Sequence, residues 1–335
     1  MRALLVGDPH VTPAELQDSE NLLELVRKTQ LEYGIATEDG PKLDVWFLGD
    51  LHNNHDALSV RVVSFWRRWF AELGDQQSLA WRGNHDQAYP DTSHPNAMAS
   101  YPDVRMVDRP RLVAPGVCGM PYYGNPEEFV QDAVMLKAFH PQARTLICHQ
   151  SFENALYDNG SPIKDGVRLD RVPFDFVIAG HHHRPQTVGK CWYPGAPRWR
   201  AIDDAPHDRF LHLLDFAEDG SYEVVTKIPT DQACRRIHHL LDVPGMPVDL
   251  SKVDLKKHDV RVDVYGDLAH VRSREQELGA LGVRCRPFPT RDKAPKVSES
   301  EGVGQAFAKF AQDWRPPHGS DKVALMKEID ARLGG

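Results

Sequence analysis

Five short blocks in this chain combine Asp, His and Asn in patterns that suit metal binding. They are Asp8-Pro9-His10, Gly49-Asp50-Leu51-His52, Gly83-Asn84-His85-Asp86, Cys148-His149-Gln150 and Gly180-His181-His182-His183. Carboxylate and amide oxygens and imidazole nitrogens are common ligands of divalent metals. Two such ions held close together can clamp a phosphate and lower the pKa of a bound water. The blocks therefore predict a two-metal site for phosphoester chemistry.

The position of each block suggests which ligand it supplies. Asp50 follows Gly49 at the end of a predicted strand, where a rigid backbone suits a carboxylate that bridges two metals. Asp8 and His10 project from one turn, so both can reach the same ion. Asn84 offers a neutral oxygen, which favours hard ions such as Mn²⁺ or Mg²⁺.

The last two blocks add nitrogen ligands from His149, His181 and His183. His182 lies between the last two of these histidines. On an extended backbone neighbouring side chains point to opposite faces. We therefore expect His182 to point away from the metals, which makes it an internal control for the motif.

The first three blocks follow predicted strands at residues 2–6, 43–48 and 78–82, which alternate with helical patterns. The first helix is expected to start at Thr12-Pro13-Ala14-Glu15, which matches a capping box with proline at the first helical position. The second helix is expected at residues 56–73. In such βαβ units ligands gather at the carboxyl ends of the strands. The three blocks should therefore meet at one edge of a sheet.

The rest of the chain predicts an α/β fold in which two packed sheets are flanked by helices. Short strands are expected at 104–107, 111–118, 145–148, 174–179, 190–193, 210–216 and 222–228, with a helix at 126–139. Packing two sheets between helices uses these elements economically. Three domains are predicted: a metal-binding domain at 1–230, a small α+β domain at 236–290, and a C-terminal helical region at 300–335 with helices at 304–314 and 321–333.

Composition limits the classes of protein that fit. The net charge is −8 over 335 residues, whereas proteins that hold a DNA duplex alone are usually basic. A DNA substrate would therefore need a local basic patch, the metals or a partner. The sequence has no apolar run near the ~18 residues that span a membrane, and a cytoplasmic protein is expected. The five scattered cysteines are expected to be reduced and mostly buried.

Taken in order, D-x-H, G-D-x-x, G-N-H-D, a lone His and G-H-x-H resemble the calcineurin-like metallophosphoesterases over residues 1–230. The resemblance implies that one metal is held by Asp8, His10, Asp50 and His183. It implies that the other is held by Asp50, Asn84, His149 and His181. Mn²⁺ is the expected ion, with Mg²⁺ as the alternative. By the same resemblance His85 faces the scissile phosphate and stabilises or protonates the leaving oxygen, while the family fold is a two-sheet sandwich with flanking helices.

Later motifs narrow the resemblance to one branch of that family. They are His94-Pro95-Asn96, Tyr101-Pro102-Asp103-Val104 and Tyr193-Pro194-Gly195-Ala196-Pro197. Their order, followed by a small capping unit, is similar to the SbcD-type nuclease subunit of the double-strand-break repair complex, especially its phage versions. This implies a DNA exonuclease or endonuclease in repair and recombination, an SbcC-type coiled-coil ATPase as partner, and a homodimer.

Two points stay open at this level. Many SbcD-like nucleases carry a histidine three residues after the bridging aspartate, where this chain has Asn53. His52 and His55 flank that position, and either is a candidate to contact the phosphate. The aromatic side chains of Trp66, Trp69 and Phe70 recur at helical spacing, which fits either a core face or a dimer interface.

Four arginines are candidates for contacts with the DNA backbone: Arg198, Arg200, Arg284 and Arg286. The alternative for each is an ordinary surface or linker position. The last predicted helix, at 321–333, fits docking on the ATPase or packing on the body of the protein. Two rival functions remain: a phosphoesterase acting on a small molecule or phosphoprotein, and a non-catalytic scaffold for the ATPase.

Overall fold

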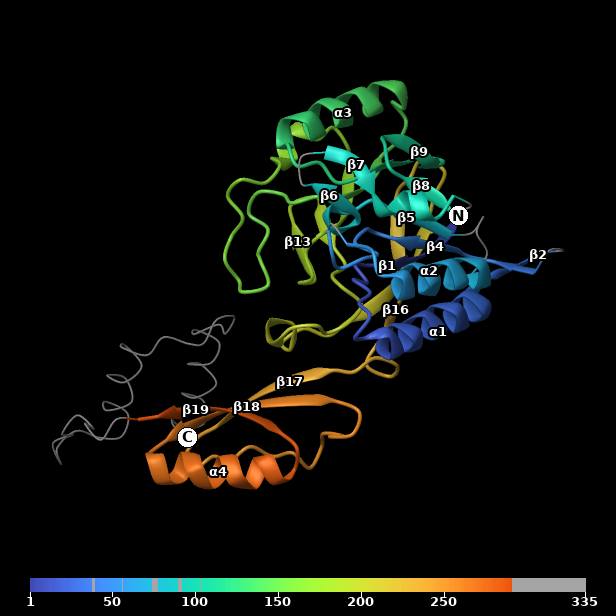
Figure 1. The fold of residues 1–335 in the computed structure, drawn as a ribbon. Coiled ribbons are helices and arrows are strands. Elements are labelled where there is room, and N and C mark those ends of the chain that lie inside the picture. The colour runs from blue at the N-terminus through green and yellow to red at the C-terminus, as the bar shows by residue number, and fades with distance from the viewer. Residues whose placement is uncertain (38–39, 56, 74–77, 90–91, 103, 291–335) are drawn as a thin grey trace. The chain divides into compact units, whose positions relative to one another are not determined.

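The computed structural model describes residues 1–290 except 38–39, 56, 74–77, 90–91 and 103 (Figure 1). The chain divides into two compact units. The N-terminal unit contains Met1–Tyr157, Ser161–Trp199 and His207–Arg235. The C-terminal unit contains Asp158–Gly160, Arg200–Pro206 and the chain from Arg236 onward.

The first sheet of the N-terminal unit has the strand order β16-β15-β1-β4-β5-β8. Its strands are β1 (Arg2–Val6), β4 (Asp44–Phe47), β5 (Ser78–Trp81), β8 (Arg105–Val107), β15 (Phe210–Phe216) and β16 (Tyr222–Pro229). β1, β4, β5 and β8 are parallel, whereas β15 and β16 run antiparallel to their neighbours. The carboxyl ends of β1, β4 and β5 therefore meet at one edge, as their βαβ pattern predicts.

The second sheet has the order β13-β14-β12-β11-β10-β9. Its strands are β9 (Arg111–Ala114), β10 (Val117–Met120), β11 (Thr145–His149), β12 (Phe176–Gly180), β13 (Gln186–Val188) and β14 (Cys191–Tyr193). The single strand predicted at 111–118 is in fact two, because Gly116 turns the chain at a φ of 68°. β11 and β12 are parallel, and their register places His149 beside Gly180.

The core between the two sheets is made of large apolar side chains from both. Trp46 and Trp81 from the first sheet lie 5.8 Å apart, measured between ring centroids, and pack with Ile147 and Ile178 from the second. The indole Nε1 of Trp81 also donates to the Ile147 carbonyl at 2.9 Å. This contact ties the sheets together at the strand that ends in His149.

Helices cover the outer faces of both sheets. α1 (Leu16–Tyr33) and α2 (Val60–Leu73) pack on the first sheet, and α3 (Pro126–Phe139) packs on the second. Trp66, Trp69 and Phe70 of α2 are all buried in the core, so this stripe is not exposed for a dimer. The predicted fold class, a two-sheet α/β sandwich flanked by helices, is confirmed.

Some local predictions were wrong. α1 starts at Leu16 with Glu15 as its N-cap, because Thr12 and Glu15 form a separate turn, closed by the Glu15 N–H and the Thr12 carbonyl at 3.3 Å. Two hairpins were not predicted: β2 (Ile35–Thr37) with β3 (Gly40–Lys42), and β6 (Gln87–Tyr89) with β7 (Thr92–Asn96). Short 3₁₀ turns span Asn84–Asp86, Ala97–Ser100, Leu169–Arg171 and Ile202–Asp204.

The C-terminal unit is a small α+β structure. Its parallel sheet has the order β17 (Ile237–Asp242), β18 (Asp259–Gly266), β19 (Arg284–Pro289). α4 (Leu268–Ala280) connects β18 to β19, and buries Val271 and Leu278 against the sheet. The helices predicted at 304–314 and 321–333, and the whole region 300–335, lie outside the described residues.

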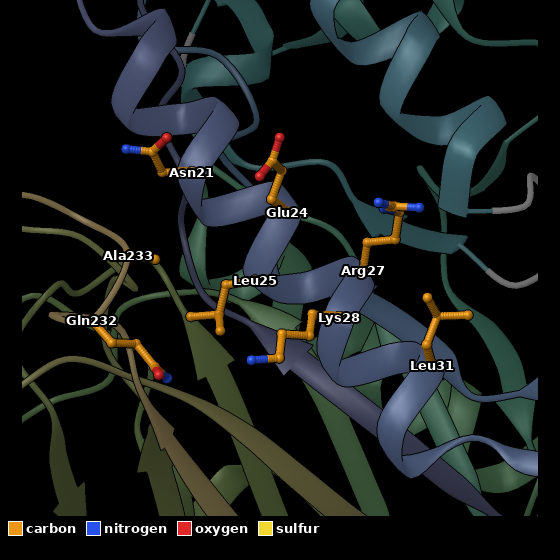
Figure 2. A pocket seen from close by; sticks show the side chains of 8 residues that line it. All are labelled: Asn21, Glu24, Leu25, Arg27, Lys28, Leu31, Gln232 and Ala233. Atoms are coloured by element: carbon orange, nitrogen blue, oxygen red, sulfur yellow. The ribbon is translucent and has the colours of Figure 1, made fainter.

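An open groove of about 680 Å³ lies beside α1 (Figure 2). Glu24, Arg27 and Lys28 line it from the helix, and Gln232 lines it from the segment after β16. None of its lining residues belongs to the five ligand blocks, so this groove is not the predicted metal site. Among the described helices, none is long and apolar enough to cross a bilayer. All five cysteines are free, and only Cys285 is not fully buried.

Candidate metal centre

The strand ends of both sheets bring the predicted ligands together. Asp8 and His10 follow β1, Asp50 follows β4, and Asn84 follows β5, all in the first sheet. The second sheet contributes His149 at the end of β11, and His181 and His183 after β12. The seven predicted metal ligands thus gather at one edge of the sandwich.

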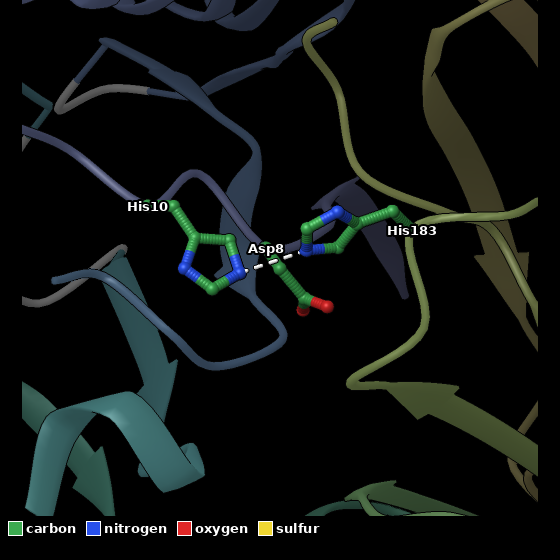
Figure 3. A group of neighbouring side chains, drawn as sticks. All are labelled: Asp8, His10 and His183. Atoms are coloured by element: carbon green, nitrogen blue, oxygen red, sulfur yellow. Dashed lines mark hydrogen bonds between the residues drawn. The ribbon is translucent and has the colours of Figure 1, made fainter. Parts of the chain in front are cut away.

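Asp8, His10 and His183 form the first ligand group (Figure 3). Their ligand atoms all lie within 4.8 Å of one another, and the Nε2 atoms of His10 and His183 are 2.9 Å apart. Asp8 Oδ2 accepts a hydrogen bond from the His181 N–H at 2.7 Å. Among the described residues, Asp8 Oδ1 is buried and has no hydrogen-bond partner. A buried carboxylate oxygen of this kind fits a metal ligand.

Asp50, His149 and His181 form the second group, and Asn84 joins it. His149 Nδ1 donates to the Leu48 carbonyl at 2.8 Å. Because a carbonyl only accepts, this bond fixes the tautomer and directs the Nε2 lone pair into the site. That Nε2 lies 3.1 Å from Asn84 Oδ1, which is also 2.7 Å from His181 Nδ1.

Asp50 lies between the two groups. Its Oδ2 is 3.4 Å from His10 Nε2 in the first group and 3.4 Å from His149 Nε2 in the second. Its Oδ1 accepts a hydrogen bond from the His85 N–H at 2.8 Å, which fixes the plane of the carboxylate. This position is the one that a bridging carboxylate requires.

Burial and charge shift the pKa values of these ligands strongly. Burial raises the pKa of Asp8 to about 8, with the Asp50 charge adding to the effect and His149 opposing it. Burial acts in the same direction on Asp50, but the imidazoles of His149 and His10 hold its pKa well below the usual range. Burial opposes the charging of His149, yet Asp50 and Asp8 raise its pKa to about 9. Such a concentration of buried carboxylates fits a site that holds cations.

Three of the ligands have strained backbones. The φ values of His10, Asp50 and His181 are 45°, 50° and 91°. Such positive φ values cost a residue other than glycine roughly 1–3 kcal/mol each. Gly49, at a φ of 117°, has no Cβ that would meet the His149 ring. A Cβ on Gly83 would meet the Asp50 carboxylate in the same way. The glycines of these two blocks therefore make room for the ligands.

His85 lies next to the first ligand group. Its ring centroid is 4.8 Å from that of His10, and its Nδ1 is 2.7 Å from the Asn53 carbonyl. That carbonyl accepts from the Nδ1–H of His85, and His85 also forms a group with His10 and Asp50 whose possible ligand atoms lie within 4.8 Å of one another. His182 does not join the ligands, as expected: its Nε2 is 3.0 Å from Ser151 Oγ, and its ring packs on Tyr193.

The structure does not support the predicted catalytic role of His52. This side chain is buried, with Nδ1 2.9 Å from Asp86 Oδ1 and Nε2 2.8 Å from the Tyr101 hydroxyl. Both ring nitrogens therefore have partners within the fold. His55, by contrast, is exposed and stacks on the ring of His85.

Asp86 was not selected from the sequence, although it belongs to the third block. Its buried carboxylate accepts hydrogen bonds from the backbone N–H groups of Leu51, His52 and Gly83, at 3.3, 3.1 and 3.0 Å. It thereby joins the loop that carries Asp50 to the loop that carries Asn84. The sequence feature that could have identified Asp86 is its position directly after Asn84 and His85.

Arg198 is not a DNA contact, because it is only 1% exposed. Its guanidinium binds the Asp18 carboxylate at 3.1 Å and the carbonyls of Pro9 and His10 at 2.8 and 3.4 Å. It therefore supports the turn that carries His10.

The other three candidate arginines lie in the C-terminal unit. Arg200 is half-buried, and its backbone N–H donates to Asp204 at 2.8 Å. Arg284 is exposed, with 67% of its side chain accessible. Arg286 is also exposed, and its guanidinium pairs with Asp263 at 2.6 Å.

Comparison with known proteins gives a family match over more than half of the chain. Residues 1–185 match the family described as calcineurin-like phosphoesterase. No curated protein matches the sequence. Among solved structures, the chain is similar to the sulfate thiohydrolase SoxB of Thermus thermophilus in complex with glycerol, with 15% identity and a TM-score of 0.33. That alignment covers 62% of this chain and 42% of the SoxB chain.

Proposed function

The chain belongs to the calcineurin-like phosphoesterase family of metal-dependent hydrolases, which bind two divalent metals, and we propose that it is a nuclease that hydrolyses phosphodiester bonds in DNA. The observation that carries this proposal is the position of His85. Its Nδ1 is anchored on the Asn53 carbonyl, and its ring lies beside the first ligand group. An alkoxide is a poor leaving group from a phosphodiester. A positioned imidazolium can protonate its oxygen as it departs.

The two ligand groups would hold the metals, with Asp50 shared between them. When bound, two divalent cations neutralise charge on the phosphate and lower the pKa of a water molecule. We propose Mn²⁺ as the ion, because the ligand set mixes imidazole nitrogens with carboxylate and amide oxygens. Mg²⁺ is the alternative.

The protein residues perform the remaining steps. The hydrogen bond from His149 Nδ1 to the Leu48 carbonyl holds the ring with its Nε2 aimed at the site. The backbone N–H of His85 orients the Asp50 carboxylate. The His85 side chain then binds the phosphodiester, and its Nε2 supplies a proton to the departing oxygen.

The C-terminal unit offers support for a nucleic-acid substrate. Tyr265 and Phe288 stack on adjacent strands with ring centroids 4.6 Å apart and planes 8° apart. The Arg286 guanidinium lies over the Phe288 ring at 4.9 Å. Aromatic rings with neighbouring arginines can bind nucleic acids through stacking and phosphate contacts. Arg284 and Arg286 thus remain candidate DNA contacts.

The net charge of −8 supports a partner that supplies most of the DNA affinity. We propose an SbcC-type coiled-coil ATPase for this role, as the SbcD resemblance implies, and double-strand-break repair or recombination as the process. The proposed docking segment, residues 300–335, lies outside the described residues. A homodimer is proposed on the same resemblance.

The test is Mn²⁺-dependent degradation of end-labelled linear duplex DNA, run beside hydrolysis of bis(p-nitrophenyl) phosphate. Wild-type protein should cleave DNA, alone or with a cognate SbcC-type ATPase. His85→Ala should retain its metals and lose roughly 10²- to 10⁴-fold in rate. Hydrolysis of the small ester with no DNA cleavage, even with the ATPase, would favour a small-molecule or phosphoprotein substrate. No hydrolysis of either substrate would favour a scaffold.

A further inference from the structure

Tyr122 lies against the second ligand group, and none of the steps described above uses it. Its ring stacks on that of His181, with centroids 5.5 Å apart and planes 29° apart. The ring of His149 meets it nearly edge-on, at 6.2 Å and 78°. Tyr122 follows the end of β10 and is half-buried. This one side chain therefore adjoins both histidines of the group.

The two histidines are oriented by different contacts. Nδ1 of His149 binds the Leu48 carbonyl at 2.8 Å, which is the usual way in which a metal-binding histidine is held from outside its site. Nδ1 of His181 instead faces the group, 2.7 Å from Asn84 Oδ1. Within the described part of the chain, all hydrogen bonds of the His181 ring use this same Nδ1. The orientation of the ring therefore depends on what packs against it.

The ring of His181 has three aromatic neighbours among the described residues. His149 and His182 meet it nearly edge-on, with planes 74° and 70° apart. Tyr122 lies along its face, and offset stacking of this kind fixes the plane of a ring. The backbone of His181 is strained, at a φ of 91°, and a strained residue keeps its conformation only where its surroundings hold it. Tyr122 thus does for His181 what the Leu48 carbonyl does for His149.

The main chain of Tyr122 is fixed by the loop that carries Asn84. Its N–H donates to the Arg82 carbonyl at 2.9 Å, and the Arg82 guanidinium donates to the Tyr122 carbonyl at 3.2 Å. Arg82 is only 4% exposed and lies two residues before Asn84. These two bonds place the ring of Tyr122 relative to the loop that supplies the amide ligand of the same group.

We propose that Tyr122 is a positioning residue for the metal of the second ligand group, because its ring holds His181 with Nδ1 directed at the other ligands. Without the ring, the His181 side chain can rotate, and its ligand atom spends less time in place. The loss falls on the group that uses His181, whereas the first group keeps its own three ligands. The inference rests on the metal-dependent hydrolase part of the proposed function and not on DNA as the substrate.

Three variants separate this role from general packing. Tyr122→Phe keeps the ring and removes only the hydroxyl, whereas Tyr122→Leu keeps apolar bulk and removes the flat ring. Tyr123→Leu is the matched control, because the side chain of this neighbouring tyrosine contacts α3 rather than the ligands. Its ring packs on Phe129 with centroids 5.8 Å apart, and its hydroxyl binds Asp132. The control therefore removes an equal ring from the same loop.

The first measurement is a calorimetric titration of each metal-free, full-length protein with Mn²⁺. The wild type should bind two ions. Tyr122→Leu should weaken one of the two sites by roughly 10- to 100-fold, the usual effect of losing a residue that orients a metal ligand, and should leave the other site unchanged. Tyr122→Phe and Tyr123→Leu should both match the wild type. Wild-type affinity at both sites in Tyr122→Leu would overturn the proposal.

A double-mutant cycle tests whether Tyr122 acts through His181. His181→Asn keeps a ligand oxygen but has no ring to stack. In that background Tyr122→Leu should cause no further loss of Mn²⁺ affinity, because the ring that it orients is gone. A further loss as large as in the wild-type background would overturn the proposal. If Tyr122→Leu does not fold, Tyr122→Gln replaces it with the same expectations.

Hydrolysis of bis(p-nitrophenyl) phosphate separates this inference from the proposed function. Excess Mn²⁺ should restore most of the activity of Tyr122→Leu, because the ring acts on metal binding and not on the substrate. A loss of activity that persists in excess Mn²⁺, with both affinities unchanged, would overturn the positioning role. A wild type that binds two Mn²⁺ ions but hydrolyses no phosphodiester would refute the proposed function alone. The titration then still decides: selective weakening in Tyr122→Leu supports the role of Tyr122, and equal binding overturns it.

Discussion

The Nε2 atoms of His10 and His183 face each other at 2.9 Å. They come from turns that follow strands of different sheets, β1 and β12. A metal ion coordinated by both nitrogens would hold the two turns together.

Removal of the metals should therefore destabilise the N-terminal unit. Ligands that bind only the folded state add about 2.7 kcal/mol when present at 100 times their dissociation constant. Excess EDTA should lower the melting temperature in scanning calorimetry, and added Mn²⁺ should restore it. His10→Ala should show a smaller shift than the wild type. An identical melting temperature with and without metal would contradict this prediction.

Asp50→Asn should reduce binding of both metals. The Asp50 Oδ2 atom is equally close to a histidine of each group, at 3.4 Å. The asparagine side chain has the same shape as aspartate but carries no negative charge. Metal content after dialysis should fall well below that of the wild type. Asp8→Asn is the comparison, because Asp8 belongs to the first ligand group alone. Full two-metal content in Asp50→Asn would refute its bridging role.

Arg198→Ala should lower stability, because it leaves the Asp18 carboxylate and two carbonyls without their buried partner. Asp18 is partly exposed and keeps the Arg235 N–H as a donor, so the loss of unfolding free energy should be about 1–3 kcal/mol. Urea unfolding measures the change, and Asp18→Asn provides the second side of a double-mutant cycle. A variant with unchanged stability and weakened DNA binding would instead restore Arg198 as a DNA contact.

His212 should make the protein sensitive to acid. Burial lowers its pKa to about 4 from an ordinary value of 6.5. Between these values the unfolded chain binds a proton that the folded chain does not, so stability falls as the pH drops from 6.5 towards 4. The free energy of unfolding falls by about 3 kcal/mol over this pH range. His212→Gln should flatten this part of the urea-unfolding pH profile, and an unchanged slope would contradict the assignment.

Strong local patterns allowed much of the fold to be predicted. The predicted bounds are correct for the strands at 2–6 and 210–216 and for the helix at 126–139. Their signals, an apolar run or a proline at the start of a helix, are local and need no knowledge of distant contacts. The gathering of Asp8, Asp50 and Asn84 followed from the parallel order of their strands.

Features set by distant contacts could not be predicted. Arg198 resembles a surface arginine in the sequence, yet its burial depends on Asp18, 180 residues away. The contrast between His52 and His55 arises from a turn in which one ring enters the fold towards Tyr101 and the other leaves it. Spacing along the chain does not encode that choice.

The ligands come from both sheets, with Asp8, Asp50 and Asn84 on the first and His149, His181 and His183 on the second. The groups Asp8-His10-His183 and Asp50-His149-His181 each need residues from the second sheet, whereas His10, Asp50 and His85 form a group that follows strands of the first sheet alone. During synthesis the N-terminal strands must therefore wait for the second sheet to dock before the second group can form. Completion of the two predicted ligand groups is thus a late folding event, which depends on docking of the two sheets.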